Sequence, residues 1–211
     1  KRLPFVSSFD AYDAMCFFGG LVFFAPVALL VRTQAGVTET RFFLLQALLS
    51  AIIVVGEIPT GRLTDKIGYR AALVLSQSLL LAARILLTLA YITHALPLFV
   101  LEAVIEGISA CFASGTDSAY LYAHAGAEEY LAKTTHAANC GTAGFLVSTV
   151  SYAAIYHFAG ITGLLFCTIV SGAAALVSTL FLPKIARTEK SGSDTAHPWR
   201  KLFSLWRDRR T

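Results

Sequence analysis

The strongest constraint on the fold is a series of six apolar runs, each about as long as a membrane-spanning helix. A helix that crosses a bilayer needs roughly 20 predominantly apolar residues. The runs fall near residues 12–31, 42–59, 71–93, 96–122, 136–158 and 160–182. Charged residues make up only 14% of the chain, against roughly 25% in soluble domains. We therefore expect an all-α membrane protein whose six transmembrane helices form one bundle over residues 1–183.

The distribution of basic residues predicts the orientation of this bundle. Cytoplasmic loops of membrane proteins carry an excess of Lys and Arg. With the N-terminus inside, fourteen basic residues fall on the cytoplasmic side and only Arg32 and Arg41 outside. Both termini are therefore expected in the cytoplasm, and a bacterial inner membrane is the expected location. The basic residues are scattered between apolar runs, which does not favour a nucleic-acid partner.

Residues 184–211 are expected to form a cytoplasmic linker followed by an amphipathic helix. The stretch "TEKSGSDTAH" is polar and has the composition of a flexible linker. After Pro198, the apolar side chains of Trp199, Leu202, Phe203 and Trp206 recur at helical spacing with arginines around them. Such a helix either lies in the membrane interface or packs on another part of the protein.

A charged, glycine-containing segment, "GEIPTGRLTDKIGYR" at residues 56–70, interrupts the apolar sequence between the second and third runs. Gly61, Asp65, Gly68 and Arg70 occupy the spacing of a signature loop. This pattern resembles the loop between helices two and three of the major facilitator superfamily. The helix count, the basic linker after the sixth run and "SGTDSAYLY" at residues 114–122 are similar to the N-terminal half of that family.

The sequence departs from parts of the family's pattern. Tyr69 stands where a basic residue is common, and Ala103 precedes Gly107 where many proton antiporters carry an arginine. The fifth run also lacks the Gly-Pro-rich antiporter motif, since "NCGTAGF" contains no proline. These differences lower the expectation of a drug-type antiporter.

The resemblance implies a secondary active transporter, or half of one, that moves a small organic solute by alternating access. Because no nucleotide-binding loop is present, energy would come from an ion or substrate gradient, and we expect proton coupling, as in a symporter. The implied partners are the solute, protons, membrane lipid and a second six-helix half. That half lies beyond residue 211 or in a second copy of the chain, and the terminal linker favours the first arrangement. No cofactor is expected.

The resemblance also assigns roles to the signature segment. Asp65 and Arg70 would join a charge network that closes the cytoplasmic side, with Asp117 as the partner of Arg70. Gly61 and Gly68 would allow neighbouring helices to approach closely. The alternative is a basic loop that only sets topology, although topology alone needs no Asp65 and no fixed glycines.

Three ionisable residues are expected at membrane depth, where charges are costly and are by default candidates for function. Arg84 in the third run and Glu106 in the fourth each lie ten residues from the predicted outer end. Glu102 precedes Glu106 by one helical turn. We expect one of the two acids to carry a proton, and Arg84 to hold the other or an anionic substrate group. The alternative is a static ion pair between the two helices.

Other function classes fit the sequence less well. An intramembrane serine protease would need a histidine in the sixth run and a glycine where Phe112 stands, so an enzyme is not expected. A receptor or assembly factor on the same scaffold stays open. The four cysteines lack metal-ligand spacing. Asp10 and Asp13 are expected to cap the first helix, and His136 and Asn139 are not assigned to a site.

Overall fold

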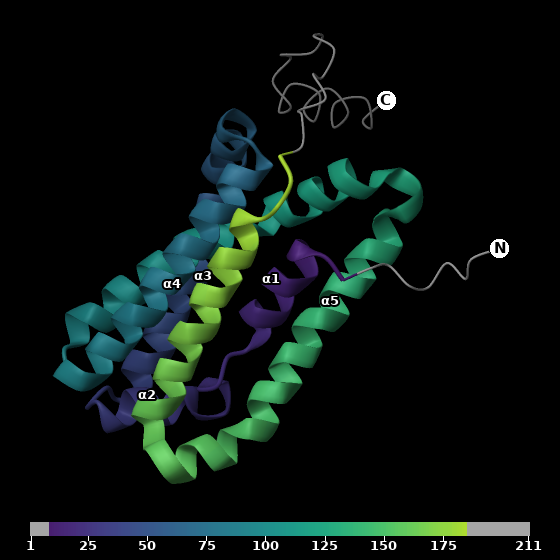
Figure 1. Ribbon diagram of the computed structural model, residues 1–211. Coiled ribbons are helices and arrows are strands. Elements are labelled where there is room, and N and C mark those ends of the chain that lie inside the picture. Colours follow the sequence, from purple (N-terminus) through teal and green to yellow (C-terminus); the bar gives the residue numbers. More distant parts are fainter. Residues whose placement is uncertain (1–8, 185–211) are drawn as a thin grey trace, which may run out of the picture.

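The computed structural model describes residues 9–184, and within that range it contains helices and no strands, as predicted. The predicted linker and amphipathic helix at 184–211 lie, apart from Lys184, outside the described residues. The helices, shown in Figure 1, are α1 (Ala11–Gly20), the short 3₁₀ helix η1 (Ala25–Val27), α2 (Ala28–Gln34), α3 (Glu39–Ile67), α4 (Tyr69–Thr93) and α5 (Leu96–Leu180).

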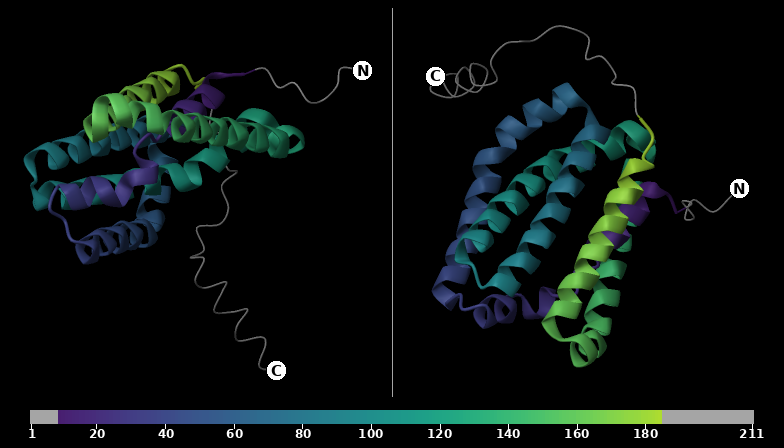
Figure 2. Two further views of the ribbon diagram at one scale, coloured as in Figure 1. Left: turned by 90° about the horizontal axis from the view of Figure 1, so that it is seen from below. Right: turned by 60° about the vertical axis from the view of Figure 1, so that its left-hand side comes forward.

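The long helix α5 bends sharply at two glycines. Gly126 has φ 75° and Gly160 has φ 62°, a backbone conformation that glycine adopts with little strain. The bends divide α5 into helical segments at 96–125, 127–159 and 161–180. Figures 1 and 2 show these segments turning back at the bends. The four stretches that are long and apolar enough to span a membrane are Ala11–Gln34, Glu39–Ile67, Tyr69–Thr93 and the whole of Leu96–Leu180.

The connections gather at two opposite ends of an elongated bundle. The α3–α4 turn, the first bend of α5 and both ends of the described chain lie toward one end in Figures 1 and 2. The α2–α3 and α4–α5 connections and the second bend lie toward the other. We call these the terminal end and the opposite end. Consecutive elements therefore run back and forth along the bundle.

The first apolar run is not one continuous helix over 12–31, as the sequence predicted. The α-helix stops at Gly20, and residues 21–24 are non-helical before η1 and α2. Pro26 begins η1, where its missing N–H is tolerated. Helical structure then continues to Gln34, so Arg32 belongs to α2 rather than to an outer loop.

The second run is longer than the predicted 42–59, because the signature segment is largely helical. Helix α3 continues through Pro59 to Ile67, and only Gly68, with φ 89°, separates it from α4. The Thr60 hydroxyl donates to the carbonyl of Gly56 at 2.7 Å within this stretch. The chain thus reverses at a single residue, and glycine suits its left-handed conformation.

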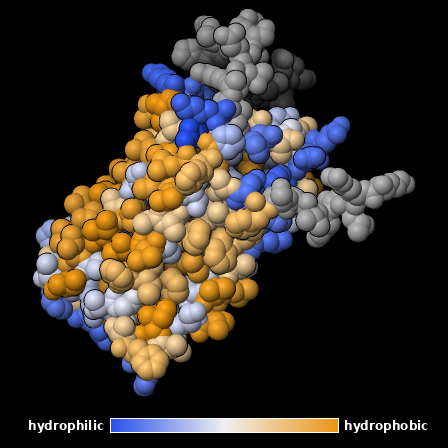
Figure 3. All heavy atoms as spheres, viewed as in Figure 1, coloured by the Kyte–Doolittle hydropathy of each residue, from blue (hydrophilic) through white to orange (hydrophobic). Residues whose placement is uncertain are grey.

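Two apolar clusters form the interior. The cluster at the opposite end includes Val31, Leu87, Phe99 and Leu165, and the one at the terminal end includes Tyr120. Large apolar side chains are also exposed on the outside, such as Phe158 at 84% and Val150 at 81%. Figure 3 shows hydrophobic residues over most of the visible side of the bundle, with hydrophilic ones toward its ends. Such a surface is expected to face lipid or another helix bundle.

Candidate functional site

A buried ion pair joins α2 to the first segment of α5. Nη2 of Arg32 lies 3.0 Å from Oε1 of Glu102, and the side chains are only 5% and 3% exposed. Glu102 is six residues into α5, which places it about 9 Å along the helix from its start. The guanidinium carbon also lies 5.4 Å from the centre of the Phe42 ring, a favourable cation–π arrangement.

The ion pair leaves hydrogen-bonding capacity unused. Oε2 of Glu102 and Nε of Arg32 are buried without a partner among the described residues. The carboxyl of Glu106, one turn further along α5, is near enough to act on the Glu102 carboxyl. Two carboxyl groups can share a hydrogen bond only when one of them is protonated. The site therefore contains one cation, two acids and a natural position for a single proton.

Arg84 lies in the middle of the bundle but does not form the predicted pair with either glutamate. Its Nη1 donates to the carbonyl of Thr168 and its Nη2 to the carbonyl of Gly19, both at 3.1 Å. Within residues 9–184 no carboxylate lies within ion-pair distance of its guanidinium. The Glu106 carboxylate is still near enough for its charge to act on Arg84. The structure thus assigns the counter-ion role for Glu102 to Arg32.

Arg84 and Ser171 complete the backbone hydrogen bonding where the first run is broken. The carbonyl of Gly19 lies in the last turn of α1, where helix carbonyls lack intrahelical partners. The Ser171 hydroxyl lies 2.9 Å from the carbonyl of Leu21, just beyond the helix end. Gly172 leaves room for Arg84, since a Cβ at that position would stand 2.7 Å from Nη1. Specific side-chain contacts therefore stabilise the break.

The predicted gating residues lie at the terminal end of the bundle, but the predicted pair between Arg70 and Asp117 is not formed. The guanidinium of Arg70 donates to the carbonyl of Leu180, at the end of α5. Asp117 instead accepts a hydrogen bond from the Tyr12 hydroxyl at 3.0 Å. The Tyr12 ring stacks on Tyr120, with the ring centres 5.6 Å apart. This arrangement ties α1, rather than the signature turn, to Asp117.

The two signature glycines have different surroundings. Gly68 is required by its positive φ, as described above. Gly61 is helical and exposed, and a Cβ there would meet nothing within 4 Å in the described part of the chain. The close approach expected at Gly61 is therefore not seen within residues 9–184. Asp65 lies on the exposed surface of the same helix end.

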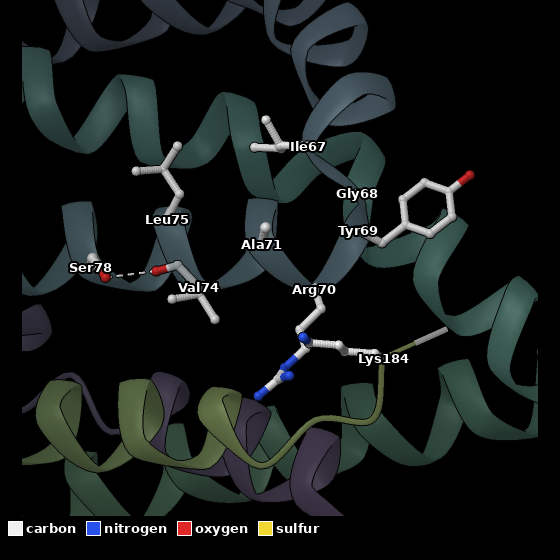
Figure 4. Close-up of a pocket in the computed structure, with 9 residues that line it drawn as sticks. All are labelled: Ile67, Gly68, Tyr69, Arg70, Ala71, Val74, Leu75, Ser78 and Lys184. Atoms are coloured by element: carbon white, nitrogen blue, oxygen red, sulfur yellow. Dashed lines mark hydrogen bonds between the residues drawn. The ribbon is translucent and has the colours of Figure 1, made fainter. Parts of the chain in front are cut away.

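A pocket of about 680 Å³ lies beside the signature turn and away from Glu102. Figure 4 shows Arg70 reaching from the start of α4 toward the end of α5, near Lys184. The residues that line it are Ile67, Gly68, Tyr69, Arg70, Ala71, Val74, Leu75, Ser78 and Lys184. The recess thus has two cations, Arg70 and Lys184, beside an apolar wall.

Sequence reasoning missed two polar features. Arg32 was placed outside because the apolar run ends at residue 31, and only the break after Gly20 shows that helix continues beyond it. Glu57 lay near the end of the second predicted run, at 42–59, and was given no role of its own; it lies in α3, ten residues before the helix ends. Its carboxylate is exposed and accepts a hydrogen bond from Ser114 at 3.3 Å.

Comparison with known proteins is consistent with these features. The sequence profile of the Major Facilitator Superfamily matches residues 14–211. No curated protein matches the chain significantly. The family match covers nearly the whole chain, including the signature turn, the buried charges of α5 and the broken first run. The protein therefore belongs to the Major Facilitator Superfamily of membrane transporters.

Proposed function

We propose that the protein moves a small organic solute by alternating access, coupled to protons through Glu102 and Glu106. The observation that carries this proposal is the buried pair of Arg32 and Glu102 beside the half-buried Glu106, in which Glu102 has one oxygen on the cation and one without a partner. Protonation of Glu106 would supply the missing donor. Loss of that proton would place two negative charges beside a single cation, which favours rearrangement.

The broken first run supports a transport role for the same region. In secondary transporters, discontinuous helices at membrane depth present backbone groups to substrates and ions. Here Arg84 and Ser171 donate hydrogen bonds to carbonyls beside the break at residues 21–24. The charge of Glu106 also acts on Arg84. Movement of the proton is thereby linked to the backbone of the first span. Arg84 positions that backbone, while Arg32 neutralises the acid.

The proposal includes six membrane crossings with both termini in the cytoplasm of a bacterial inner membrane. In this proposal the bends at Gly126 and Gly160 would divide α5 into three crossings, and Ala11–Gln34, α3 and α4 would supply the others. In this orientation fourteen basic residues would be cytoplasmic and Arg41 would lie at the outer end of α3, whereas Arg32 belongs to α2. That excess supports the orientation. Single cysteines at Thr38 and His94 should react with an impermeant thiol reagent from outside, whereas one at Lys190 should not.

A second six-helix unit is expected to complete the transport path. The exposed Glu57 lies about 15 Å from the end of α3, a depth at which an acid is unfavourable in lipid. Its contact with Ser114 marks a polar strip between α3 and α5. We propose that this strip faces the aqueous path and the second unit, which is either further chain or a second copy. A receptor on the same scaffold would show no uptake.

The test uses the full chain in proteoliposomes, with a solute first identified by a thermal-shift screen. The parent should accumulate that solute against its gradient when a pH gradient is applied. Glu102→Gln and Glu106→Gln should lose accumulation but keep solute exchange at equal pH. Accumulation by both variants at the parent rate would contradict proton coupling at these residues. Absence of both uptake and exchange in the parent would contradict the transport proposal itself.

A further inference from the structure

A second group of chemically distinctive side chains lies near the terminal end, apart from the proposed proton site. The carboxylate of Asp13 on α1 lies 2.9 Å from Nδ1 of His136 on the middle segment of α5. Sγ of Cys140 lies 3.9 Å from the same nitrogen. One ligand atom from each of the three residues falls within 4.8 Å of the others. Within the described residues, this is the one such group with three different donor types.

We propose that Asp13, His136 and Cys140 form a binding site for a zinc-like divalent cation. Carboxylate oxygen, imidazole nitrogen and thiolate sulfur are all common zinc ligands. In a tetrahedral zinc site their atoms stand about 3.3 Å (O to N) and about 3.6 Å (N to S) apart. The observed distances of 2.9 and 3.9 Å differ from these values by less than about half an ångström, within the reach of small side-chain rotations.

The residues around the group hold its ligands in place. His136 and Cys140 are four residues apart on one helix, so their side chains share a face. Asp13 is 1% exposed, and its other oxygen accepts the backbone N–H of Asp10 at 3.1 Å, which leaves Oδ1 directed at His136. Asp10 is itself tied to Lys133 at 2.8 Å. Hydrogen-bonded support of this kind orients metal ligands and strengthens binding.

Charge and access also suit a divalent cation. The Asp13 carboxylate and the Cys140 thiolate would neutralise a dipositive ion, with neutral His136 as the third ligand. Cys140 must lose its proton to water on binding. The His136 side chain is 33% exposed, which allows an ion to enter and a water molecule to take the fourth position. A bound cation would link α1 to α5. This link does not depend on proton transport at Glu102 and Glu106.

The alternative is that the three residues only form a hydrogen-bonded contact. Binding of Zn²⁺, added as its chloride, is measured on the full chain in detergent by competition with a chromophoric chelator. We expect one Zn²⁺ per chain that is lost or weakened at least tenfold in Cys140→Ser and in His136→Gln. The matched control is Cys167→Ser, which removes a thiol from the last segment of α5 and should bind as the parent does.

Co²⁺ provides a second readout that reports the sulfur directly. The parent and Cys167→Ser should show a thiolate-to-cobalt absorption band that is absent from Cys140→Ser. Size-exclusion profiles identify any variant that fails to fold. Cys140→Ser, which replaces only the sulfur atom, is then the variant whose Zn²⁺ and Co²⁺ binding is compared with the parent. Unchanged Zn²⁺ affinity in Cys140→Ser and His136→Gln would overturn the site. A parent that binds no Zn²⁺, or gives no thiolate band with Co²⁺, would overturn it equally.

Discussion

Arg32 and Arg84 are both buried in the helix bundle, but their surroundings compensate the guanidinium group in different ways. Arg32 faces a carboxylate, Glu102, at 3.0 Å, and their neighbours Val31 and Ala103 belong to the apolar cluster of the opposite end. Arg84 faces two backbone carbonyls where α1 ends against α5. The first arrangement depends on the charge of a titratable partner, whereas the second depends on the path of the backbone. Substitutions that change the charge of a carboxylate should therefore destabilise the Arg32 region. Substitutions that alter the backbone path should destabilise the Arg84 region.

The largest effect is expected from Arg32→Ala, because it leaves the buried Glu102 without its cation. Breaking one side of a buried ion pair costs about 3–5 kcal/mol of unfolding free energy. Adding Glu102→Gln should restore much of that loss, since the unpaired charge is removed. Unfolding in mixed micelles measures both variants. An Arg32→Ala protein as stable as the parent would show that the pair contributes nothing.

A smaller effect is expected from Arg84→Ala. The carbonyl of the half-buried Gly19 loses its donor, and an unsatisfied acceptor of this kind costs up to about 1–3 kcal/mol. Glu102→Gln should not rescue this variant, because no carboxylate is paired with Arg84 among the described residues. Arg84→Lys should recover only part of the loss, since one ammonium group cannot reproduce the fork that reaches both carbonyls. Rescue of Arg84→Ala by Glu102→Gln would erase the distinction between the two arginines.

Substitutions at Glu106 test whether Glu102, in the Arg32 region, is stabilised by a hydrogen-bond donor on its neighbour. Glu106→Gln keeps an N–H donor for Glu102, so its stability should stay within about 0.5 kcal/mol of the parent. Glu106→Leu removes that donor and should cost about 1–2 kcal/mol more than Glu106→Gln. The same unfolding assay compares the two. Equal stabilities would mean that Glu102 gains nothing from its neighbour.

The smallest effect is expected from Ser171→Ala in the Arg84 region. The carbonyl of Leu21 loses one hydrogen bond, which is typically worth about 1 kcal/mol. Hydrogen exchange should then accelerate at the backbone amides of residues 21–24, because the broken stretch is held less firmly. Thr149→Ala, which removes an exposed hydroxyl from another segment of α5, is the control and should leave those amides unchanged.

The sequence predicted the signature turn better than the buried charges, and the reason is the range of the interactions. The turn at Gly68 depends on a local glycine pattern, which a sequence motif records directly. The pairing of Arg32 depends on the helix break at residues 21–24, which carries α2 three residues beyond the predicted end of the run. Hydropathy alone ends the apolar run before Arg32. The cap of Asp10 and Asp13 on α1 is local, and that prediction is confirmed.

Long-range contacts were the least predictable. Arg84 and Glu106 were predicted at the same distance from the outer end of their helices. The Arg84 guanidinium nevertheless binds the carbonyls of Gly19 and Thr168, because helix packing brings those carbonyls nearer. Arg70 likewise reaches Leu180 rather than Asp117. In both cases residue depth was predicted, but the direction of the side chain depended on contacts with distant segments.

The most direct test of the central claim is the infrared carboxyl spectrum of the purified full chain near neutral pH, which needs no substrate. If Glu102 and Glu106 share one proton beside Arg32, the parent should show the C=O stretch of a buried neutral carboxyl. That band should vanish in Glu106→Gln and in Glu102→Gln and persist in Arg84→Lys. Asp117→Asn identifies any contribution from the other acid of α5. A spectrum in which neither glutamine substitution changes the neutral-carboxyl band would contradict the claim.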